Sequence, residues 1–346
     1  MVRFLSQLKP VNLKDKVCLL RLDFNTDDNW RWLASLPTLK LLTAHCQAVV
    51  ILSHKGRPAG REKRLSLKRY AKDISRAIKK PVSFAPHFRF PEIKKIIQSS
   101  PKKSVFLLEN LRFLKEEGDN SSALAKRLAT LGDLYINDAF AVSHRANASI
   151  SAITKFLPSF AGFELEAEIK NLSRVIKKPQ KPLVVILGGL KIEDKLRVVK
   201  NLHRTASAFL IGGALNTAII HKISGIGKLV LSEDFKYEKG AIRDIGPKSI
   251  KKFGKEILTA RTIIWNGPAG DITKPKFTAG TKAIARAVTA NLKSFKIVGG
   301  GETVAFLKKL KLDKKFDFVS TGGGAMLDFL AGKKLPGLEA LKINKR

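Results

Sequence analysis

Leu183-Val-Val-Ile-Leu-Gly-Gly-Leu-Lys-Ile-Glu-Asp-Lys195 is the stretch that indicates the fold most directly. Its first five residues form a continuous apolar run, which is typical of a strand buried on both faces of a parallel sheet. Gly188 and Gly189 then permit a tight turn, and Lys191 and Lys195 follow one helical turn apart. A helix start of this kind attracts anions, most often phosphate. The stretch matches neither a Walker loop nor the dinucleotide fingerprint, so an ordinary strand–helix connection remains the alternative.

The composition is that of a globular protein long enough for two domains. The chain has 346 residues, of which 44% are hydrophobic and 27% charged, and a domain usually holds about 100–200 residues. No apolar run approaches the roughly 18 residues of a membrane-spanning helix, and the first residues lack the apolar core of a signal peptide. Cys18 and Cys46 form neither a disulfide framework nor a metal-ligand cluster. We expect a cytoplasmic, monomeric protein with two buried thiols and no membrane segment.

The net charge is strongly positive. The chain has 65 Lys and Arg against 29 Asp and Glu, a formal net charge of +36, and such a balance can indicate nucleic-acid binding. The lysines, however, occur as scattered pairs rather than in blocks, and few aromatic residues that could stack on bases lie between them. We therefore expect at most weak, non-specific binding of nucleic acid. A dedicated nucleic-acid surface remains the alternative.

The first half of the sequence alternates apolar strands with helix-period segments. Strands are expected at Val17–Leu22, Ala48–Leu52, Val82–Phe84, Ser104–Leu108 and Leu134–Ile136, and helices at Leu36–Cys46, at Leu67–Lys79 with Ser66 as N-cap, and after Asp119-Asn120-Ser121. The carboxyl ends of parallel strands meet at one edge of a sheet, where ligands bind. Polar side chains follow four of these ends: Arg21, Asp23, Asn25, His54, Arg57, Arg112, His144 and Arg145, which Arg31 in the next loop can join.

This group of side chains predicts an anion site. Any one arginine on a surface is usually part of a weak ion pair, worth about 0–1 kcal/mol. Five arginines and two histidines at one edge repel one another, however, and a multiply charged anion would offset that repulsion. The planar guanidinium fork suits carboxylate and phosphate.

A helix is expected between the two halves, over residues 162–178. Leu165, Ile169, Leu172 and Ile176 are spaced as one helical stripe. Three glutamates (Glu164, Glu166, Glu168) begin the helix, two lysines end it and Pro179 follows, as the helix dipole favours. The division that follows is an N-terminal domain over 1–161, this interdomain helix, and a C-terminal domain over 179–330.

The second half repeats the strand–helix alternation, with glycines at the strand ends. Strands are expected at Leu183–Leu187, Phe209–Ile211, Lys228–Leu231, Thr262–Trp265, Lys296–Val298 and Phe316–Val319. Bare backbone N–H groups in such turns can bind phosphate oxygens, although a glycine turn can also serve tight packing. The turns are Gly212-Gly213, Asn266-Gly-Pro-Ala-Gly270, Gly299-Gly-Gly-Glu-Thr303 and Ser320-Thr-Gly-Gly-Gly-Ala325. We predict two Rossmann-like parallel-sheet α/β domains facing a cleft, as suits a kinase with two phosphorylated ligands.

These motifs resemble the phosphoglycerate kinase family, in order and over nearly the whole chain. The N-terminal ones are Arg21-Leu-Asp-Phe-Asn25, Leu36-Pro-Thr38, Ser53-His-Lys-Gly-Arg-Pro58, Leu108-Glu-Asn-Leu-Arg-Phe113, Asn137-Asp-Ala-Phe140 and His144-Arg145. The C-terminal ones are Gly188-Gly-Leu-Lys-Ile-Glu-Asp-Lys195, Asp244-Ile-Gly-Pro247, Trp265-Asn-Gly-Pro268 and the two triple-glycine turns. Leu335-Pro-Gly337 resembles the family's return segment, which makes 331–346 a tail on the N-terminal domain.

The resemblance implies reversible transfer of the acyl phosphate of 1,3-bisphosphoglycerate to ADP with Mg²⁺, giving 3-phosphoglycerate and ATP. Arg31, Lys191, Gly300 and Gly301 would stabilise the transferring group. The phosphoglycerate would be bound by Arg21, Asp23, Phe24, Asn25, Arg31, His54, Lys55, Gly56, Arg57, Arg112, His144 and Arg145. The nucleotide would be bound by Gly188, Gly189, Lys191, Lys195, Gly212, Gly213, Asn266, Pro268, Gly299, Gly300, Gly301, Glu302 and Thr303, with the metal reached by Glu302 through the nucleotide.

The sequence departs from the family pattern at several places. Asn147 stands where the family has a second histidine, Glu302 where it has a metal-associated aspartate, and Thr273 where a ribose-binding glutamate is expected. The stretch 214–244 is much shorter than usual, which implies a helix lost beside the nucleotide. Two alternatives therefore accompany the kinase: an inactive paralogue that binds nucleic acid or other anions through its basic surface, and a different acyl-phosphate or carboxylate kinase on this scaffold.

Overall fold

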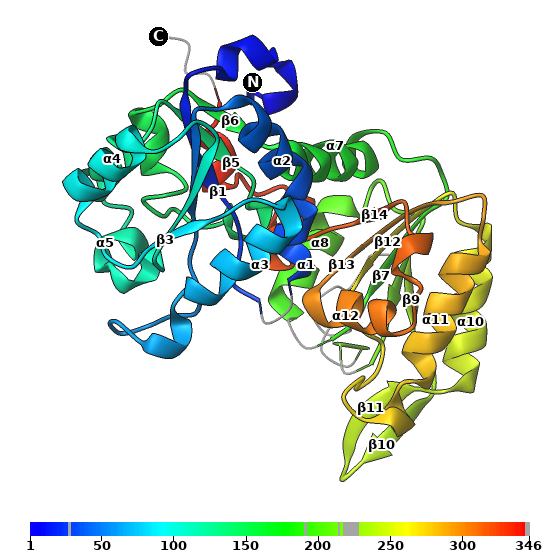
Figure 1. The fold of residues 1–346 in the computed structure, drawn as a ribbon. Helices are drawn as coiled ribbons and strands as arrows, with labels where there is room; N and C mark the ends of the chain where they lie inside the picture. The colour runs from blue at the N-terminus through cyan, green and yellow to red at the C-terminus, as the bar shows by residue number, and fades with distance from the viewer. Residues whose placement is uncertain (27–28, 190–191, 214, 217–227, 343–346) are drawn as a thin grey trace. The chain divides into compact units, whose positions relative to one another are not determined.

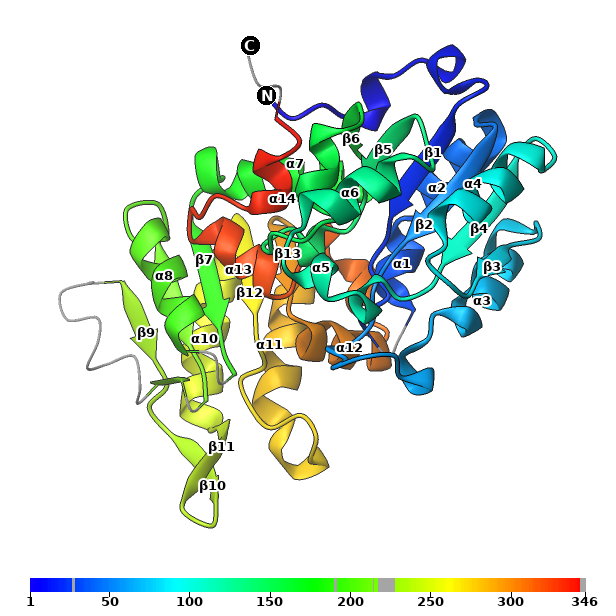
Figure 2. The ribbon, with the colours of Figure 1, turned by 90° about the vertical axis from the view of Figure 1, so that its left-hand side faces the viewer.

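The structure is a computed structural model, and it describes all residues except 27–28, 190–191, 214, 217–227 and 343–346. The chain divides into two compact units (Figures 1 and 2). Unit 1 comprises Met1–Ala167 and Lys334–Arg346, and unit 2 comprises Glu168–Lys333. The boundary between them falls inside helix α7 (Phe163–Lys177), the helix expected to join the two halves. Among the described residues, no helix is long and apolar enough to cross a membrane.

Unit 1 is built on a six-stranded sheet with the order β3-β4-β2-β1-β5-β6, in which every pair is parallel. The strands are β1 (Val17–Arg21), β2 (Ala48–Leu52), β3 (Ser83–Ala85), β4 (Ser104–Leu108), β5 (Leu134–Asn137) and β6 (Ser159–Ala161). The helices are α1 (Trp30–Ala34), α2 (Leu36–His45), α3 (Lys68–Ile78), α4 (Phe90–Ser99), α5 (Lys115–Gly118), α6 (Ser122–Ala129) and α14 (Pro336–Glu339). The central strands are continuous apolar runs because both faces of the sheet are covered.

Most of the elements expected in unit 1 are present, and several details differ. The strands β2 and β4 have the expected bounds, and Ser121 caps α6 by accepting a hydrogen bond from the Leu124 amide. Ser66 is not the N-cap of α3; Leu67 is, and the Ser66 hydroxyl accepts from the Lys68 amide one residue outside that position. The helices α1, α4 and α5 and the strand β6 were not expected.

Unit 2 repeats the architecture with the strand order β14-β13-β12-β7-β8-β9, again parallel throughout. The strands are β7 (Leu183–Leu187), β8 (Ala208–Ile211), β9 (Leu229–Leu231), β12 (Thr262–Asn266), β13 (Phe295–Gly299) and β14 (Phe318–Val319). The helices are α8 (Ile192–Leu202), α10 (Pro247–Thr259), α11 (Ala279–Ala290), α12 (Gly301–Lys309) and α13 (Gly324–Leu330). A two-stranded antiparallel hairpin, β10 (Phe235–Glu238) and β11 (Ala241–Ile245), extends from this unit and was not expected (Figure 1).

The buried face of α7 differs from the expected stripe. Leu165 and Leu172 are buried as expected, but Ile169 and Ile176 are only half-buried. Two of the glutamates, Glu166 and Glu168, are buried instead. The helix therefore presents carboxylates to its surroundings where the spacing predicted isoleucine, and these carboxylates need hydrogen-bond donors.

The first residues of the chain and its last described residues are both paired within unit 1. Val2 forms an antiparallel bridge with Lys342, and Phe4 a parallel bridge with Ala161 at the end of β6. The amide of Gly337 in α14 donates to the Ser143 carbonyl at 2.9 Å. Residues more than 300 positions apart along the chain are thus joined within one unit.

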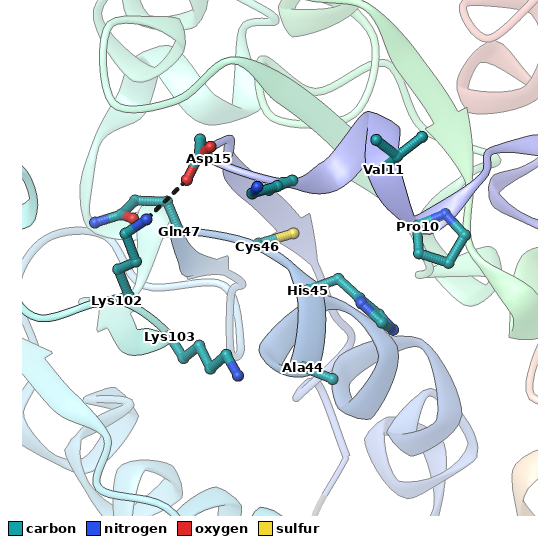
Figure 3. A pocket seen from close by; sticks show the side chains of 10 residues that line it. Pro10, Val11, Asp15, Ala44, His45, Cys46, Gln47, Lys102 and Lys103 are labelled. Carbon is teal, nitrogen blue, oxygen red and sulfur yellow. Dashed lines mark hydrogen bonds and ion pairs between the residues drawn. The ribbon is translucent and has the colours of Figure 1, made fainter.

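A surface pocket of about 390 Å³ lies at the amino ends of β1, β2 and β4 (Figure 3). It is lined by Pro10, Val11, Lys14, Asp15, Ala44, His45, Cys46, Gln47, Lys102 and Lys103. The Sγ atoms of Cys46 and Cys18 are 3.2 Å apart and both thiols are buried and free, as the sequence predicted. Their hydrogen bond, together with burial, raises the pKa of the Cys18 thiol. Because this pocket is at the opposite edge of the sheet from the strand carboxyl ends, it is not the predicted ligand site.

Candidate functional site

In unit 1 the polar residues after β1 form a small hydrogen-bonded group. An Arg31 Nη1 atom lies 3.1 Å from Asp23 Oδ2, and the other Asp23 oxygen accepts from the Asn25 amide at 2.9 Å. Asn25 Oδ1 in turn accepts from the Gly56 amide at 2.8 Å, which ties the turn after β2 to the turn after β1. Arg31 lies in helix α1 rather than in the loop where it was expected. The ion pair holds the Arg31 guanidinium at the edge of the sheet while leaving it partly exposed.

His54 and Arg21 are fully buried where β1 and β2 end. Arg21 Nη2 lies 2.8 Å from His54 Nδ1. Burial, followed by the charges of Arg21, Arg112 and Arg145, lowers the pKa of His54 well below its usual value. The imidazole is therefore neutral at neutral pH, and it adds no further positive charge to the edge.

The remaining arginines differ in the hydrogen bonds that fix their side chains. Arg112 Nη2 donates to Asn147 Oδ1 at 3.2 Å, and burial is the main cause that lowers the pKa of Arg112. Arg145 Nε donates to His144 Nε2 at 3.1 Å. Arg57 is exposed and makes no hydrogen bond or ion pair with the described residues. Arg57, Arg112 and Arg145 thus make no ion pair with a carboxylate among the described residues, whereas Arg31 is paired with Asp23.

Three residues that were expected to contact a ligand have side chains that are directed to the protein. Phe24 is fully buried and stacks on Tyr70 with ring centroids 4.4 Å apart. Lys55 Nζ donates to the Thr26 carbonyl at 2.9 Å and lies 3.1 Å from the Tyr70 hydroxyl. Arg21 has no exposed surface. Residue type alone did not reveal these orientations, because each side chain is drawn inward by a partner distant in sequence.

A buried carboxylate close to the arginines was not predicted from the sequence. Glu117, at the end of α5, accepts from the Ser149 hydroxyl at 2.6 Å and from the Ser149 amide at 2.9 Å. Burial raises its pKa, while Arg21 and the Ser149 bonds oppose that rise. Asn147 also belongs to this group, since its Nδ2 donates to the Glu117 carbonyl at 3.1 Å. The residue in the place of a family histidine therefore connects the Arg112 guanidinium, through Oδ1, to the Glu117 carbonyl, through Nδ2.

In unit 2 the strand ends are backbone turns packed against each other. A Cβ atom on Gly188 would lie 2.1 Å from the Pro268 carbonyl oxygen, and one on Gly213 would lie 2.6 Å from the Ala269 carbonyl oxygen. Gly267, at φ +93°, is equally close to the Gly188 backbone. Only glycine permits these approaches. The predicted turns after β7, β8 and β12 are thereby brought together at one edge of the sheet.

Lys195 is placed at the same edge. It lies in α8 and is almost fully buried, and a Cβ atom on Gly189 would lie 3.4 Å from its Nζ. The ammonium group therefore lies over the glycine turn, as the spacing predicted. Lys191, the other predicted lysine, is outside the described residues.

The triple glycine after β13 begins a helix, as expected. Gly300, at φ +93°, is the N-cap of α12, which starts at Gly301, and the first N–H groups of a helix have no partner within it. Glu302 is exposed in the first turn, and the Thr303 hydroxyl is buried without a hydrogen-bond partner among the described residues. Asn266 is close by, since a Cβ atom on Gly300 would lie 3.5 Å from its Nδ2.

The second triple-glycine turn is bound to α7. Glu168 is fully buried and accepts from the Thr321 amide at 2.6 Å, the Thr321 hydroxyl at 2.8 Å and the Ser320 hydroxyl at 2.9 Å. Burial raises the pKa of Glu168 to about 7 despite these bonds. A buried acid on α7 was not predicted; its signal was the run Glu164, Glu166, Glu168, which the helix dipole had seemed sufficient to explain.

Two positions bear on the nucleotide side. Thr273, in the place of the ribose-binding glutamate, donates its hydroxyl to Asp271 Oδ1 at 2.5 Å and is exposed. Among the described residues, no three His, Cys, Asp or Glu side chains come together as a metal site. Glu302, on a helix start that presents free amides, is compatible with a metal held largely by phosphate oxygens.

Two parallel-sheet units, one with cations and the other with bare glycine turns at the strand carboxyl ends, define a two-domain α/β kinase. The family model described as "Phosphoglycerate kinase" matches residues 8–240 and 221–333. The chain belongs to the phosphoglycerate kinase family. No comparison favours the inactive paralogue.

Relatives and solved structures agree over nearly the whole chain. The chain is 38% identical to the phosphoglycerate kinase of Dictyoglomus turgidum, with 97% of this chain and 98% of that protein covered. The phosphoglycerate kinase structure from Coxiella burnetii has a TM-score of 0.82 at 30% identity, covering 99% of both chains. The one from Pyrococcus horikoshii has a TM-score of 0.86 at 27% identity, covering 99% and 98%. These values also support the predicted fold class.

The comparisons also bear on the shortened stretch. The alignment with the Dictyoglomus turgidum protein runs over 387 residues, more than the 346 of this chain, so this chain lacks residues that the relative has. The two segments matched by the family model overlap at 221–240, inside the stretch 214–244. The family pattern is therefore interrupted in that part of unit 2.

Proposed function

We propose that this chain catalyses reversible transfer of the acyl phosphate of 1,3-bisphosphoglycerate to ADP, in the presence of Mg²⁺, giving 3-phosphoglycerate and ATP. The observation that carries the proposal is the set of cations at the sheet edge of unit 1 in a chain of this family. Positive charge is in excess there, because Arg57, Arg112 and Arg145 make no ion pair with a carboxylate among the described residues and only Arg31 is paired, with Asp23. A phosphoglycerate supplies the negative charges that would offset it.

The two substrates would bind to different units. We assign the phosphoglycerate to unit 1, with Asp23, Asn25, Gly56, His54 and His144 orienting or accompanying the arginines. We assign the nucleotide to the glycine turns of unit 2, together with Lys191 and Lys195. The side-chain burial of Lys195 against Gly189 supports a role at phosphate oxygens, which approach a bare turn closely.

The chemistry requires no general base. An oxygen of the ADP β-phosphate, already ionised at neutral pH, forms a bond to the phosphorus of the acyl phosphate. The bond between that phosphorus and the acyl oxygen breaks, and the carboxylate of 3-phosphoglycerate leaves. Protein groups therefore act by positioning and by stabilising charge. In this proposal Arg31, Lys191 and the amides of Gly300 and Gly301 stabilise the transferring group.

Mg²⁺ would neutralise charge on the nucleotide phosphates. Glu302 would approach the metal through the nucleotide, since its carboxylate is exposed in the first turn of α12. Glutamate is one methylene longer than aspartate, so its reach toward the metal would differ from that of the family's aspartate.

A coupled assay tests this function directly. ATP formation is measured from 1,3-bisphosphoglycerate and Mg-ADP, with acetyl phosphate replacing the bisphosphoglycerate as control. We expect ATP from the first donor only. ATP from acetyl phosphate at a similar rate would favour a different acyl-phosphate kinase, and ATP from neither donor would favour the inactive paralogue.

The net charge of +36 motivates a second measurement. We propose that the protein is a cytoplasmic monomer whose nucleic-acid binding is weak, independent of sequence and steeply reduced by salt, because counterion release drives such binding. Titration of a labelled DNA duplex at several salt concentrations would show this. A tight complex with one defined sequence at physiological salt would contradict it.

A further inference from the structure

The side chain of Arg21 is fully enclosed by protein acceptors. Its Nε donates to Ser149 Oγ at 2.9 Å, one terminal nitrogen donates to the Leu22 carbonyl, and the other lies 2.8 Å from His54 Nδ1. A guanidinium carries N–H donors only and stays charged at any pH at which the protein is folded. Arg21 has no exposed surface, so its guanidinium is directed at protein acceptors, although its position at the end of β1 suggested a ligand contact.

The Arg21 contact fixes the protonation state of His54. An N–H of Arg21 faces Nδ1, so Nδ1 must accept and the imidazole proton must be on Nε2. A second proton on Nδ1 would oppose one N–H to another and would add a charge beside Arg112 and Arg145, which already lower the pKa of this histidine. His54 is thus held as one tautomer of the neutral ring.

The remaining nitrogen of His54 has no hydrogen-bond partner in the part of the chain that the structure describes. The Nε2 atom is buried, and no described residue accepts a hydrogen bond from it. Buried donors are almost always paired in proteins, so an orphaned one calls for an acceptor from outside the protein. A carboxylate or phosphate oxygen meets that need without the repulsion that a further cation would add.

We propose that Arg21 is a positioning residue that holds His54 as the neutral Nε2–H tautomer, so that this N–H donates to an oxygen of the anionic substrate. The identity of that substrate rests on the proposed function. The tautomer itself does not, because it follows from the contacts of Arg21 alone.

Glu117 and Ser149 complete the arrangement. The Ser149 hydroxyl accepts from Arg21 Nε and donates to Glu117 Oε1 at 2.6 Å, so one hydroxyl connects the buried cation to the buried carboxylate. Glu117 is itself fully buried. The carboxylate balances the charge of Arg21 and orients it through Ser149, which leaves the ligand-facing arginines free of that task.

The first experiment observes the protein without substrate. Two-bond ¹H–¹⁵N spectra of the full chain with ¹⁵N-labelled histidine distinguish the two neutral tautomers and the imidazolium, and His54→Gln identifies the His54 signals among the six histidines. We expect the Nε2–H tautomer with no titration between about pH 6 and 8, the range in which an ordinary histidine changes charge. An Nδ1–H tautomer or an imidazolium at pH 7 would overturn the proposal.

The second experiment uses Ser149→Ala and Arg21→Lys. Both should allow His54 to populate both tautomers, and both should raise the KM for 3-phosphoglycerate about tenfold with a smaller change in kcat, as loss of one oriented hydrogen bond predicts. Ser151→Ala is the matched control, because the Ser151 hydroxyl has no partner among the described residues. It should change neither the spectrum nor the KM.

The outcomes separate this proposal from the proposed function. Folded Ser149→Ala protein with wild-type His54 signals and wild-type KM would contradict the positioning role. If Arg21→Lys does not fold, the wild-type spectrum and Ser149→Ala still decide. A wild-type protein with the expected tautomer but no turnover of 1,3-bisphosphoglycerate would contradict the function and leave the role of Arg21 intact.

Discussion

Each unit has its own parallel six-stranded sheet, but different groups lie at the carboxyl ends of the strands in the two sheets. Unit 1 uses side chains, with arginines and histidines after four of its strands. Unit 2 uses the backbone, with glycine turns so close that a Cβ atom on Gly188 or Gly267 would meet carbonyl oxygen at 2.1 Å. A side-chain site depends on where each long group is directed, whereas a backbone site depends on the absence of side chains. Single substitutions should therefore affect the two kinds of site differently, through lost side-chain contacts in unit 1 and through steric overlap in unit 2.

The units also differ in how they accommodate a buried carboxylate. Glu117 in unit 1 accepts from Ser149 and is close to the charge of Arg21. Glu168 in unit 2 is held by hydroxyls and an amide, and hydrogen bonds alone are the main influences that counter its burial. The first carboxylate is compensated by a cation and the second by dipoles, which predicts a stronger response to pH in unit 2.

The largest effect is expected from a single side chain in unit 1. Arg31→Ala should lower kcat about 10²–10³-fold, because a cation directed at a transferring phosphoryl group stabilises the transition state. The free energy of unfolding should fall by no more than about 1 kcal/mol, since Asp23 keeps the hydrogen bond from the Asn25 amide. Steady-state kinetics and thermal unfolding measure the two quantities.

Arg64→Ala is the matched control for this variant. Arg64 forms an exposed ion pair with Glu62 on the same unit and should affect neither kcat nor stability. If Arg31→Ala retains near wild-type kcat, Arg31 does not stabilise the transferring phosphoryl group.

In unit 2 we expect a large effect of pH on the free energy of unfolding. The pKa of Glu168 is about 7 in the folded protein and 4.5 in its ordinary state. Because the folded state binds this proton more tightly than the unfolded state, the stabilisation that the proton provides is complete below about pH 4.5 and is lost as the pH rises through 7. The cost at higher pH is on the order of 3 kcal/mol. Glu168→Gln should remove that part of the pH dependence.

Thermal unfolding of both proteins between about pH 5 and 8 tests this sign, and the difference between them isolates Glu168. The wild type should lose stability relative to Glu168→Gln as the pH rises. A difference that is constant across this range would show that Glu168 is ionised with its ordinary pKa, and the contrast with Glu117 would disappear.

A smaller effect is expected from a backbone site in unit 2. Gly188→Ala places a methyl group against the Pro268 carbonyl and should destabilise unit 2 by about 1–3 kcal/mol, as overpacking usually does. Gly254→Ala is the control, because Gly254 lies in α10 with open space around it. It should stabilise the helix by about 0.5–1 kcal/mol. Denaturant unfolding followed by hydrogen exchange in β7 and α10 measures both, and equal effects would contradict the packing argument.

The smallest effect is expected at the nucleotide base. With the stretch 214–244 shortened, affinity should come from phosphates and Mg²⁺, and apolar contacts separate similar ligands by only about 1–3 kcal/mol even in complete pockets. We expect a raised KM for ADP, a kcat largely retained, and kcat/KM for GDP, CDP and UDP within about tenfold of ADP. Assays under identical Mg²⁺ measure this. A strong preference for ADP would show that other residues rebuild the base pocket.

The sheets were largely predictable, and the omissions have identifiable causes. Apolar runs bounded by turn residues gave β2, β4 and β7 at their observed bounds. The strand β6 has three residues and pairs with β5, so nothing local marks it. The helix α4 did carry a signal in the sequence, since a proline lies in its first turn and Phe90, Ile93 and Ile97 are spaced as one buried face.

The residue types of the site could be predicted from the sequence, but the directions of their side chains could not. An arginine after a strand can face a ligand, as Arg57 can, or be buried among protein acceptors, as Arg21 is. Which outcome occurs depends on Ser149, a residue 128 positions away whose hydroxyl receives the Arg21 hydrogen bond. Glycine turns avoid this difficulty, because a missing side chain has no orientation to predict.

The order in which the chain is made gives the discontinuity of unit 1 a consequence during synthesis. Unit 2 is encoded within unit 1, since unit 1 resumes only at Lys334. A ribosome adding about 5–20 residues per second needs roughly 10–30 s to pass from Glu168 to Lys333, and domains fold as units once they emerge. During that interval unit 1 lacks the Gly337–Ser143 hydrogen bond and the Val2–Lys342 bridge. The nascent protein therefore carries an incomplete first unit, open to chaperones, while the second unit is already being made.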